Sequence, residues 1–134
     1  MRKMIKALLV SFVLSLAVSS TAFAWENDIN TAISKAKANG KMVFIMFGRE
    51  ACGNCQHLKK MIKSGAVDVK VNKFVIADIN CDDKKQSAVF YKKYSVNGNY
   101  LPFVVIAKPD GTMITSKTGY GEAAEYNNLI KSAK

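Results

Sequence analysis

The chain has 134 residues, which is enough for one ordinary domain and too few for two. Apolar residues make up 49% and charged residues 22%, which excludes a disordered chain, and 8 Gly with 2 Pro exclude a collagen-like one. The net charge is +10; three of the basic residues lie among the first six, and the lysines after residue 24 are scattered. A nucleic-acid-binding protein usually clusters its basic residues, so we expect no nucleic-acid partner.

The first 24 residues have the pattern of a secretory signal peptide. Three basic residues among the first six precede an uncharged apolar run over residues 7–18, and the sequence Ala-Phe-Ala ends at Ala24. The apolar run is shorter than the roughly 20 residues that a membrane-spanning helix needs. We therefore expect cleavage after Ala24 and export of a mature domain, residues 25–134. An uncleaved membrane anchor is the alternative.

Residues 26–39 predict an amphipathic helix at the start of the mature chain. Apolar residues recur there at helical spacing, and either Asn27 or Asp28 can cap the first turn. Gly40 is placed to end the helix.

The next segments predict a buried strand followed by a second helix. Residues 42–47 are an unbroken apolar run with β-branched and aromatic members, which is typical of a strand buried on both faces. After a short loop, a second helical pattern begins at Cys52 and ends at Gly65. Residues 66–72 are ambiguous between a short helix and an irregular link.

The remaining pattern completes an α/β fold. Strands are predicted over residues 74–79, 103–107 and 112–118, and helices over residues 82–94 and 122–132. A helix links the first two strands, which favours parallel pairing through a right-handed crossover, and the turn at 109–111 makes the last two strands a hairpin. We expect a mixed four-stranded sheet with helices on both faces.

Cys52 and Cys55 form a C-x-x-C motif where the first strand passes into the second helix. The free N–H groups and positive dipole at a helix start stabilise a thiolate at Cys52, and the spacing brings Cys55 beside it to close a disulfide. A disulfide across so short a loop restrains the unfolded chain little, so we expect a redox-cycling pair. Gly53 between them allows a second chain to approach closely.

Three segments carry a shared pattern: a buried strand running into C-x-x-C, a second strand, and a proline that opens the third strand before a hairpin. They are VFIMFGREACGNC (43–55), FVIADIN (74–80) and YSVNGNYLPFVVIAKPDG (94–111). In these segments, and over nearly all of residues 26–133, the chain resembles the thioredoxin superfamily. The resemblance implies a thioredoxin-like fold and thiol–disulfide exchange without a cofactor. It also implies that Pro102 is a cis-proline facing the disulfide.

The resemblance further implies which residues meet a substrate. The backbone of Leu101 pairs with an extended substrate chain, and Gly53 and Asn54 lie between the two cysteines against it. Thioredoxins carry Trp-Cys-Gly-Pro-Cys, so Asn54 restores a backbone donor that proline lacks and alters the redox potential in a direction that the sequence does not fix. The mature chain also lacks a counterpart of the first thioredoxin strand.

A second departure concerns a carboxylate near the cysteines. Thioredoxins carry a buried Asp in the strand before the motif, and Met46 occupies that position here. We therefore hypothesise that Asp78, on the next strand, supplies the missing carboxylate and transfers a proton to or from Cys55. The alternative is an Asp at a strand end whose oxygens are satisfied by backbone donors.

Two further residues have both a functional and an ordinary interpretation. Cys81 is either a half-buried small apolar side chain or a third thiol that resolves, is glutathionylated or binds a metal. His57, the only histidine, is either a solvated surface residue or a group that tunes the thiols. The ordinary interpretation is the one that we favour for each.

The sequence therefore predicts a periplasmic or secreted thiol–disulfide oxidoreductase that exchanges its cysteine pair with protein substrates. A small domain without a helical insertion favours a reductant, and we expect a monomer. The redox partner is an electron-donating or electron-accepting thiol protein, often membrane-bound in this superfamily. One alternative is a copper or zinc module built from Cys52, Cys55 and either Cys81 or His57. Another is a non-catalytic interaction domain whose cysteines only form a staple.

Overall fold

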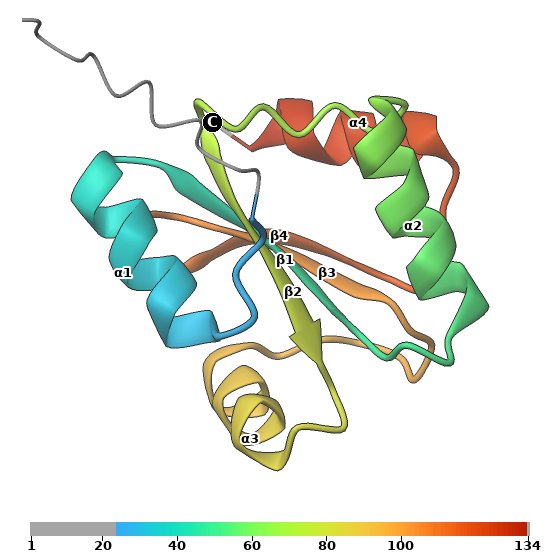
Figure 1. Cartoon of the computed structure of the whole chain (residues 1–134), viewed down its shortest axis with the longest axis horizontal. Coiled ribbons are helices and arrows are strands. Elements are labelled where there is room, and N and C mark those ends of the chain that lie inside the picture. The colour runs from blue at the N-terminus through green and yellow to red at the C-terminus, as the bar shows by residue number, and fades with distance from the viewer. Residues whose placement is uncertain (1–23, 134) are drawn as a thin grey trace, which may run out of the picture.

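The computed structural model describes residues 24–133 of the chain, so the predicted signal peptide lies outside the described residues except for Ala24. The predicted fold class is confirmed: a mixed four-stranded sheet carries helices on both faces (Figure 1). Within this described part of the chain, no helix has the length and apolar character needed to cross a membrane.

The sheet has the strand order β2-β1-β3-β4. Its strands are β1 (Met42–Gly48), β2 (Phe74–Asn80), β3 (Phe103–Ala107) and β4 (Met113–Thr118). β1 pairs in parallel with β2 and antiparallel with β3, and β3 and β4 form the predicted hairpin. β1 is thus an inner strand with a partner on each side, which explains its unbroken apolar sequence.

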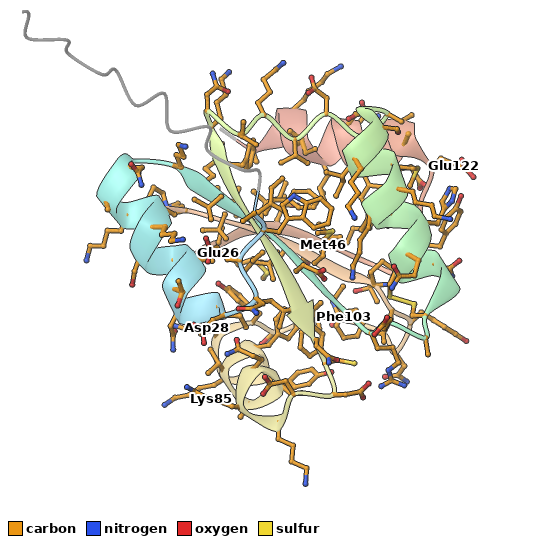
Figure 2. All side chains as sticks on the ribbon, viewed as in Figure 1. Glu26, Asp28, Met46, Lys85, Phe103 and Glu122 are labelled. Atoms are coloured by element: carbon orange, nitrogen blue, oxygen red, sulfur yellow. A yellow bond between two sulfur atoms is a disulfide. The ribbon has the colours of Figure 1, made fainter. Side chains whose placement is uncertain are left out.

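The helices form two layers over the sheet. They are α1 (Ile29–Asn39), α2 (Gly53–Ser64), α3 (Lys84–Lys93) and α4 (Ala123–Ser132). Successive β1 residues alternate between two hydrophobic cores, one shared with α1 and α3 and the other with α2 and α4. Figure 2 shows Met46 on the α2 and α4 side and Phe103 on the α1 and α3 side.

The first helix begins three residues later than its periodicity predicts. Asp28 is the N-cap residue, and its carboxylate accepts a hydrogen bond of 2.8 Å from the Thr31 N–H. Glu26 instead lies alongside β2, where its N–H donates to the Ile76 carbonyl and its carbonyl accepts from the Asp78 N–H. Before α1, the described residues therefore contribute one isolated bridge to β2 rather than a full strand. Residues 66–72 form an irregular link.

Gln86 is a buried polar residue that sequence reasoning missed. Its side-chain carbonyl accepts from the Ile29 N–H at 2.9 Å, and its amide donates to the Asp28 carboxylate at 2.7 Å. Gln86 lies on α3, so these two bonds tie α3 to the start of α1. Figure 2 labels Asp28 at the start of α1 and Lys85 in the first turn of α3, and the charge of Lys85 acts on the Asp28 carboxylate. The N–H of Ile29, the first residue of α1, is therefore satisfied by a residue 57 positions away.

The cap on α1 makes stability depend on pH. The hydrogen bond from the Thr31 backbone is the main reason that the pKa of Asp28 lies below its usual value, and burial opposes it. The resulting stabilisation is complete above the unfolded-state pKa of about 3.9 and is lost as the pH falls through the lower folded-state pKa. Asp28→Ala should therefore lower the free energy of unfolding by about 1 kcal/mol near neutral pH and by less at about pH 3. Urea unfolding at both pH values measures this.

Asn27→Ala is the matched control for that measurement. Asn27 is the neighbouring exposed polar residue and does not cap the helix, so its replacement should change the free energy of unfolding by less than about 0.5 kcal/mol. Equal effects of the two variants at neutral pH would contradict the role of Asp28.

Candidate active site

The two motif cysteines lie where β1 ends and α2 begins. Cys52 and Cys55 form a disulfide whose Cα atoms are 5.2 Å apart. The two residues differ in exposure, because Cys52 is only half-buried whereas Cys55 is 3% exposed. An incoming thiol or disulfide can therefore reach Cys52 directly, while Cys55 is shielded by the fold.

Cys52 is also the N-cap residue of α2. Its backbone is extended, and its Sγ accepts a hydrogen bond from the Cys55 N–H at 3.2 Å. The first turn of α2 contains no acidic residue. The helix dipole and the free N–H groups at this end therefore act on the sulfur without an acidic side chain in the same turn, which favours a thiolate in the reduced pair.

Gly48 is a site residue that sequence reasoning missed. A Cβ atom built on Gly48 would lie 2.6 Å from Cys55 Sγ and 4.0 Å from Pro102 Cβ. The end of β1, the buried sulfur and the proline therefore meet at one point, and a side chain there would displace the sulfur. A glycine at the end of a buried strand, just before C-x-x-C, is the signal that indicates such a contact.

The segment before β3 forms another wall of the site. The peptide bond between Leu101 and Pro102 is cis, as the resemblance implied, and Pro102 is buried. The Pro102 carbonyl accepts a hydrogen bond of 3.0 Å from the Gly119 N–H, which fixes this segment to the end of β4. The backbone N–H and carbonyl of Leu101 have no hydrogen-bond partner within residues 24–133. They are available to a second chain.

Aromatic side chains border the same region. Tyr100 is 80% exposed, and its Cβ lies 3.4 Å from the point where a Cβ on Gly119 would be. Tyr120 follows Gly119, is 41% exposed, and packs against the His57 ring with 5.6 Å between ring centroids. His57 is exposed and contacts this tyrosine, in line with its interpretation as a surface residue.

Asp78 faces α2 from the neighbouring strand. It pairs in register with Met46, and its carboxylate forms an ion pair of 2.9 Å with Lys59. Lys59 lies four residues after Cys55, so both side chains are on the same side of α2. Asp78 also lines a small hollow together with Gly48. The partner that the structure gives the Asp78 carboxylate is thus a lysine.

Cys81 follows the end of β2 and packs on the face of the sheet opposite Asp78. Its N–H donates to the Gly48 carbonyl at 2.8 Å, and the Arg49 guanidinium donates to its Sγ at 3.3 and 3.4 Å. Arg49 also pairs with Asp82 at 3.3 Å, and the contact with Cys81 is the main cause that raises the pKa of Arg49. Cys81 is half-buried and packs against the α1 and α3 core, as its ordinary interpretation predicts.

The described residues do not assemble the ligand set of the metal-binding alternative. Across residues 24–133, no three His, Cys, Asp or Glu side chains are placed together to hold a metal ion.

Gly53 and Asn54 are exposed between the cysteines, and space around Gly53 is open. The roles predicted for these two residues, and for Pro102, Leu101 and Asp78, stay predictions.

Comparisons with known proteins agree with this geometry. Residues 29–134 match the model of a thioredoxin-like domain family. Among solved structures, a point-mutant thioredoxin from Halobacterium salinarum has 22% identity and a TM-score of 0.61 over 81% of this chain and 88% of its own. Spinach chloroplast thioredoxin f has 18% identity and a TM-score of 0.59 over 81% and 82%.

A chain from the complex of ferredoxin:thioredoxin reductase with thioredoxin f2 is similar as well. It has 20% identity and a TM-score of 0.63 over 81% of this chain and 93% of its own. No curated protein matches the sequence. Because these identities are low, the structural neighbours establish the fold alone.

The contact at Gly48 predicts a large effect for one added methyl group. Gly48→Ala should lower the free energy of unfolding of the oxidised protein by about 1–3 kcal/mol, because the new Cβ overlaps Cys55 Sγ. Gly53→Ala is the matched control: its Cβ meets no atom within 4 Å, so the variant should be as stable as the wild type or slightly more stable. Thermal unfolding of both variants measures the difference, and equal stability would disprove the close packing.

Proposed function

The chain belongs to the thioredoxin-like domain family, and on that premise we propose that it is an exported thiol–disulfide oxidoreductase that reduces disulfides in protein substrates. The observation that carries the proposal is the arrangement of the pair at the start of α2. The accessible sulfur caps a helix whose first turn has no acidic residue, and the second sulfur is buried behind it. This asymmetry gives the two cysteines different tasks.

Reduction of a substrate proceeds in two exchanges. The Cys52 thiolate attacks one sulfur of the substrate disulfide, that bond breaks, and the released substrate thiolate takes up a proton. Cys55 loses its proton and attacks Cys52 Sγ, which breaks the mixed disulfide and releases the second substrate thiol. Two electrons have then passed to the substrate, and the Cys52–Cys55 disulfide has formed. A thiol partner restores the dithiol.

The wall beside the disulfide is suited to an extended protein segment. The unpaired backbone groups of Leu101 offer one donor and one acceptor to a strand laid across Cys52. Tyr100 and Tyr120 supply exposed aromatic surface next to Gly119. Gly53 and Asn54 leave the approach to the sulfur open, since both are exposed. We therefore assign Leu101, Gly53 and Asn54 to substrate binding.

Export is proposed from the signal-peptide pattern of the first 24 residues. Trp25, the first residue after the expected cleavage, packs against the α2 and α4 core beneath Lys63. The proposed site of action is the periplasm or the extracellular space. The partner is a thiol protein, often membrane-bound in this superfamily, and a complex of a thioredoxin with its reductase is among the structural neighbours. The protein acts as a monomer.

The redox pair provides the principal test. Equilibration in glutathione buffers, followed by alkylation and mass spectrometry, should give a reversible two-electron couple near the thioredoxin value of about −270 mV. Cys52→Ser should abolish reduction of a model protein disulfide. Cys55→Ser should also stop turnover but accumulate a mixed disulfide at Cys52, because the buried resolving thiol is missing.

Three other results would contradict parts of this proposal. A potential near about −120 mV would make the protein an oxidant and overturn the reductant role. A pair that never cycles would favour the non-catalytic interaction domain. Export is tested on the same material, since protein recovered from the periplasm or medium should begin at Trp25. A full-length chain held in the cytoplasm would contradict export.

We propose in addition that Asp78 transfers the proton of Cys55. Asp78→Asn should slow resolution of the mixed disulfide by about 100-fold and remove one inflection from its pH–rate profile, because the amide cannot accept the proton. Lys59→Gln is the matched control: it breaks the same ion pair but leaves the carboxylate, so the inflection should persist. An unchanged profile in Asp78→Asn would leave Asp78 with a structural role only.

A further inference from the structure

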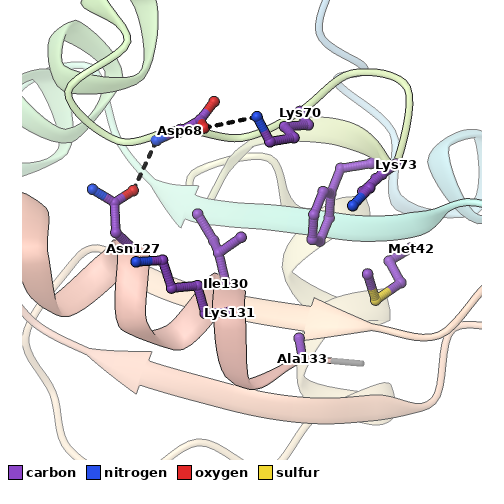
Figure 3. A pocket seen from close by; sticks show the side chains of 9 residues that line it. Met42, Asp68, Lys70, Lys73, Asn127, Ile130, Lys131 and Ala133 are labelled. Atoms are coloured by element: carbon purple, nitrogen blue, oxygen red, sulfur yellow. Dashed lines mark hydrogen bonds and ion pairs between the residues drawn. The ribbon is translucent and has the colours of Figure 1, made fainter.

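A second hollow lies at the end of the sheet opposite the disulfide (Figure 3). Its apolar floor comes from the first residues of β1 and β2 and from the end of α4: Met42, Phe74, Ile130 and Ala133. β1 runs from Met42 to Gly48, which touches the buried sulfur, and a strand of that length spans about 20 Å. The hollow is therefore separate from the thiol chemistry.

The walls of the hollow are fixed by hydrogen bonds. Asn127 on α4 accepts from the Asp68 N–H and donates to the Ala66 carbonyl, both at 2.8 Å, which ties α4 to the link before β2. In that link, the N–H groups of Lys73 and Phe74 both donate to the Lys70 carbonyl at 2.9 Å. The backbone around the hollow is thus held in place without a ligand.

The rim of the hollow carries an excess of positive charge. Lys70, Lys73 and Lys131 line it, and Figure 3 shows Ile130 between Lys131 and the other two. Asp68 is the only acidic residue among the described residues that line the hollow, and it already pairs with Lys70 at 3.0 Å. Lys73 and Lys131 have no ion-pair partner in the part of the chain that the structure describes.

We propose that this hollow binds a small amphipathic anion, with an apolar chain or ring on the floor and a carboxylate or phosphate group at the rim that carries Lys73 and Lys131. The cavity volume of about 530 Å³ is in the range of small-molecule sites. Two uncompensated ammonium groups above apolar side chains favour a ligand with both properties. A neutral ligand would form no ion pair with the lysines, and an inorganic anion would bury none of the apolar side chains of the floor.

Titration with alkyl carboxylates, followed by backbone amide NMR of the purified protein, tests the proposal. Octanoate should shift the amides of residues 66–74 and 127–133 saturably. Each methylene added between butanoate and octanoate should tighten binding by up to about fourfold, because it is buried on the floor. Octylammonium should bind more weakly than octanoate. Octyl phosphate should bind more tightly than inorganic phosphate.

The lysines are tested by a matched pair of double variants. Lys73→Gln with Lys131→Gln should weaken octanoate binding by about threefold to tenfold, because two exposed charge contacts are lost. The control replaces Lys92 and Lys93, exposed lysines in the last turn of α3, with Gln and should leave binding unchanged. Unchanged amide shifts outside the hollow and retained disulfide exchange verify that each variant is folded.

Several outcomes would overturn the proposal. Affinity that does not depend on chain length would mean a simple anion site, and equal binding of octylammonium would mean that the lysines take no part. Binding to vesicles of anionic phospholipid without binding of free octanoate would reassign the surface to a membrane. Because the length of β1, about 20 Å, separates the hollow from the disulfide, failure of this proposal leaves the oxidoreductase proposal intact. Failure of the oxidoreductase proposal likewise leaves this one intact.

Discussion

The architecture of the site depends on one close contact, between the end of β1 and the buried sulfur of Cys55. Only hydrogen fits on the Cα of Gly48, because a methyl group would lie 2.6 Å from that sulfur. β1 is an inner strand buried on both faces, so its end is held by two neighbouring strands and two hydrophobic cores. The disulfide is therefore positioned by the most constrained part of the molecule rather than by a surface loop.

The ion pairs around the cysteines also bear on the thiolate at Cys52. The two carboxylates that approach the end of β1 from neighbouring segments each have a cationic partner, Lys59 for Asp78 and Arg49 for Asp82. Neither carboxylate presents an unpaired negative charge to the sulfurs. The start of α2, whose first turn has no acidic residue, favours a thiolate at Cys52, the more accessible of the two sulfurs.

The sequence was sufficient for the elements whose signal is local. The unbroken apolar run of β1, the turn that makes the hairpin of β3 and β4, and the position of C-x-x-C at a helix start are all readable without a structure. Gly48 and Gln86 were missed because their roles depend on residues distant in sequence or on another element. The helix periodicity also extended α1 to Glu26, because a local pattern cannot detect that β2 has a free edge nearby.

Because β2 has this free edge, the short segment before α1 also protects the sheet against aggregation. A sheet whose outer strand exposes unpaired N–H and carbonyl groups invites pairing with the strands of other chains, which leads to aggregation. Glu26 occupies two of these groups on β2, from Ile76 and Asp78, and its side chain pairs with Lys35 on α1. A single residue thus shields the middle of the strand and keeps neighbouring molecules from extending the sheet.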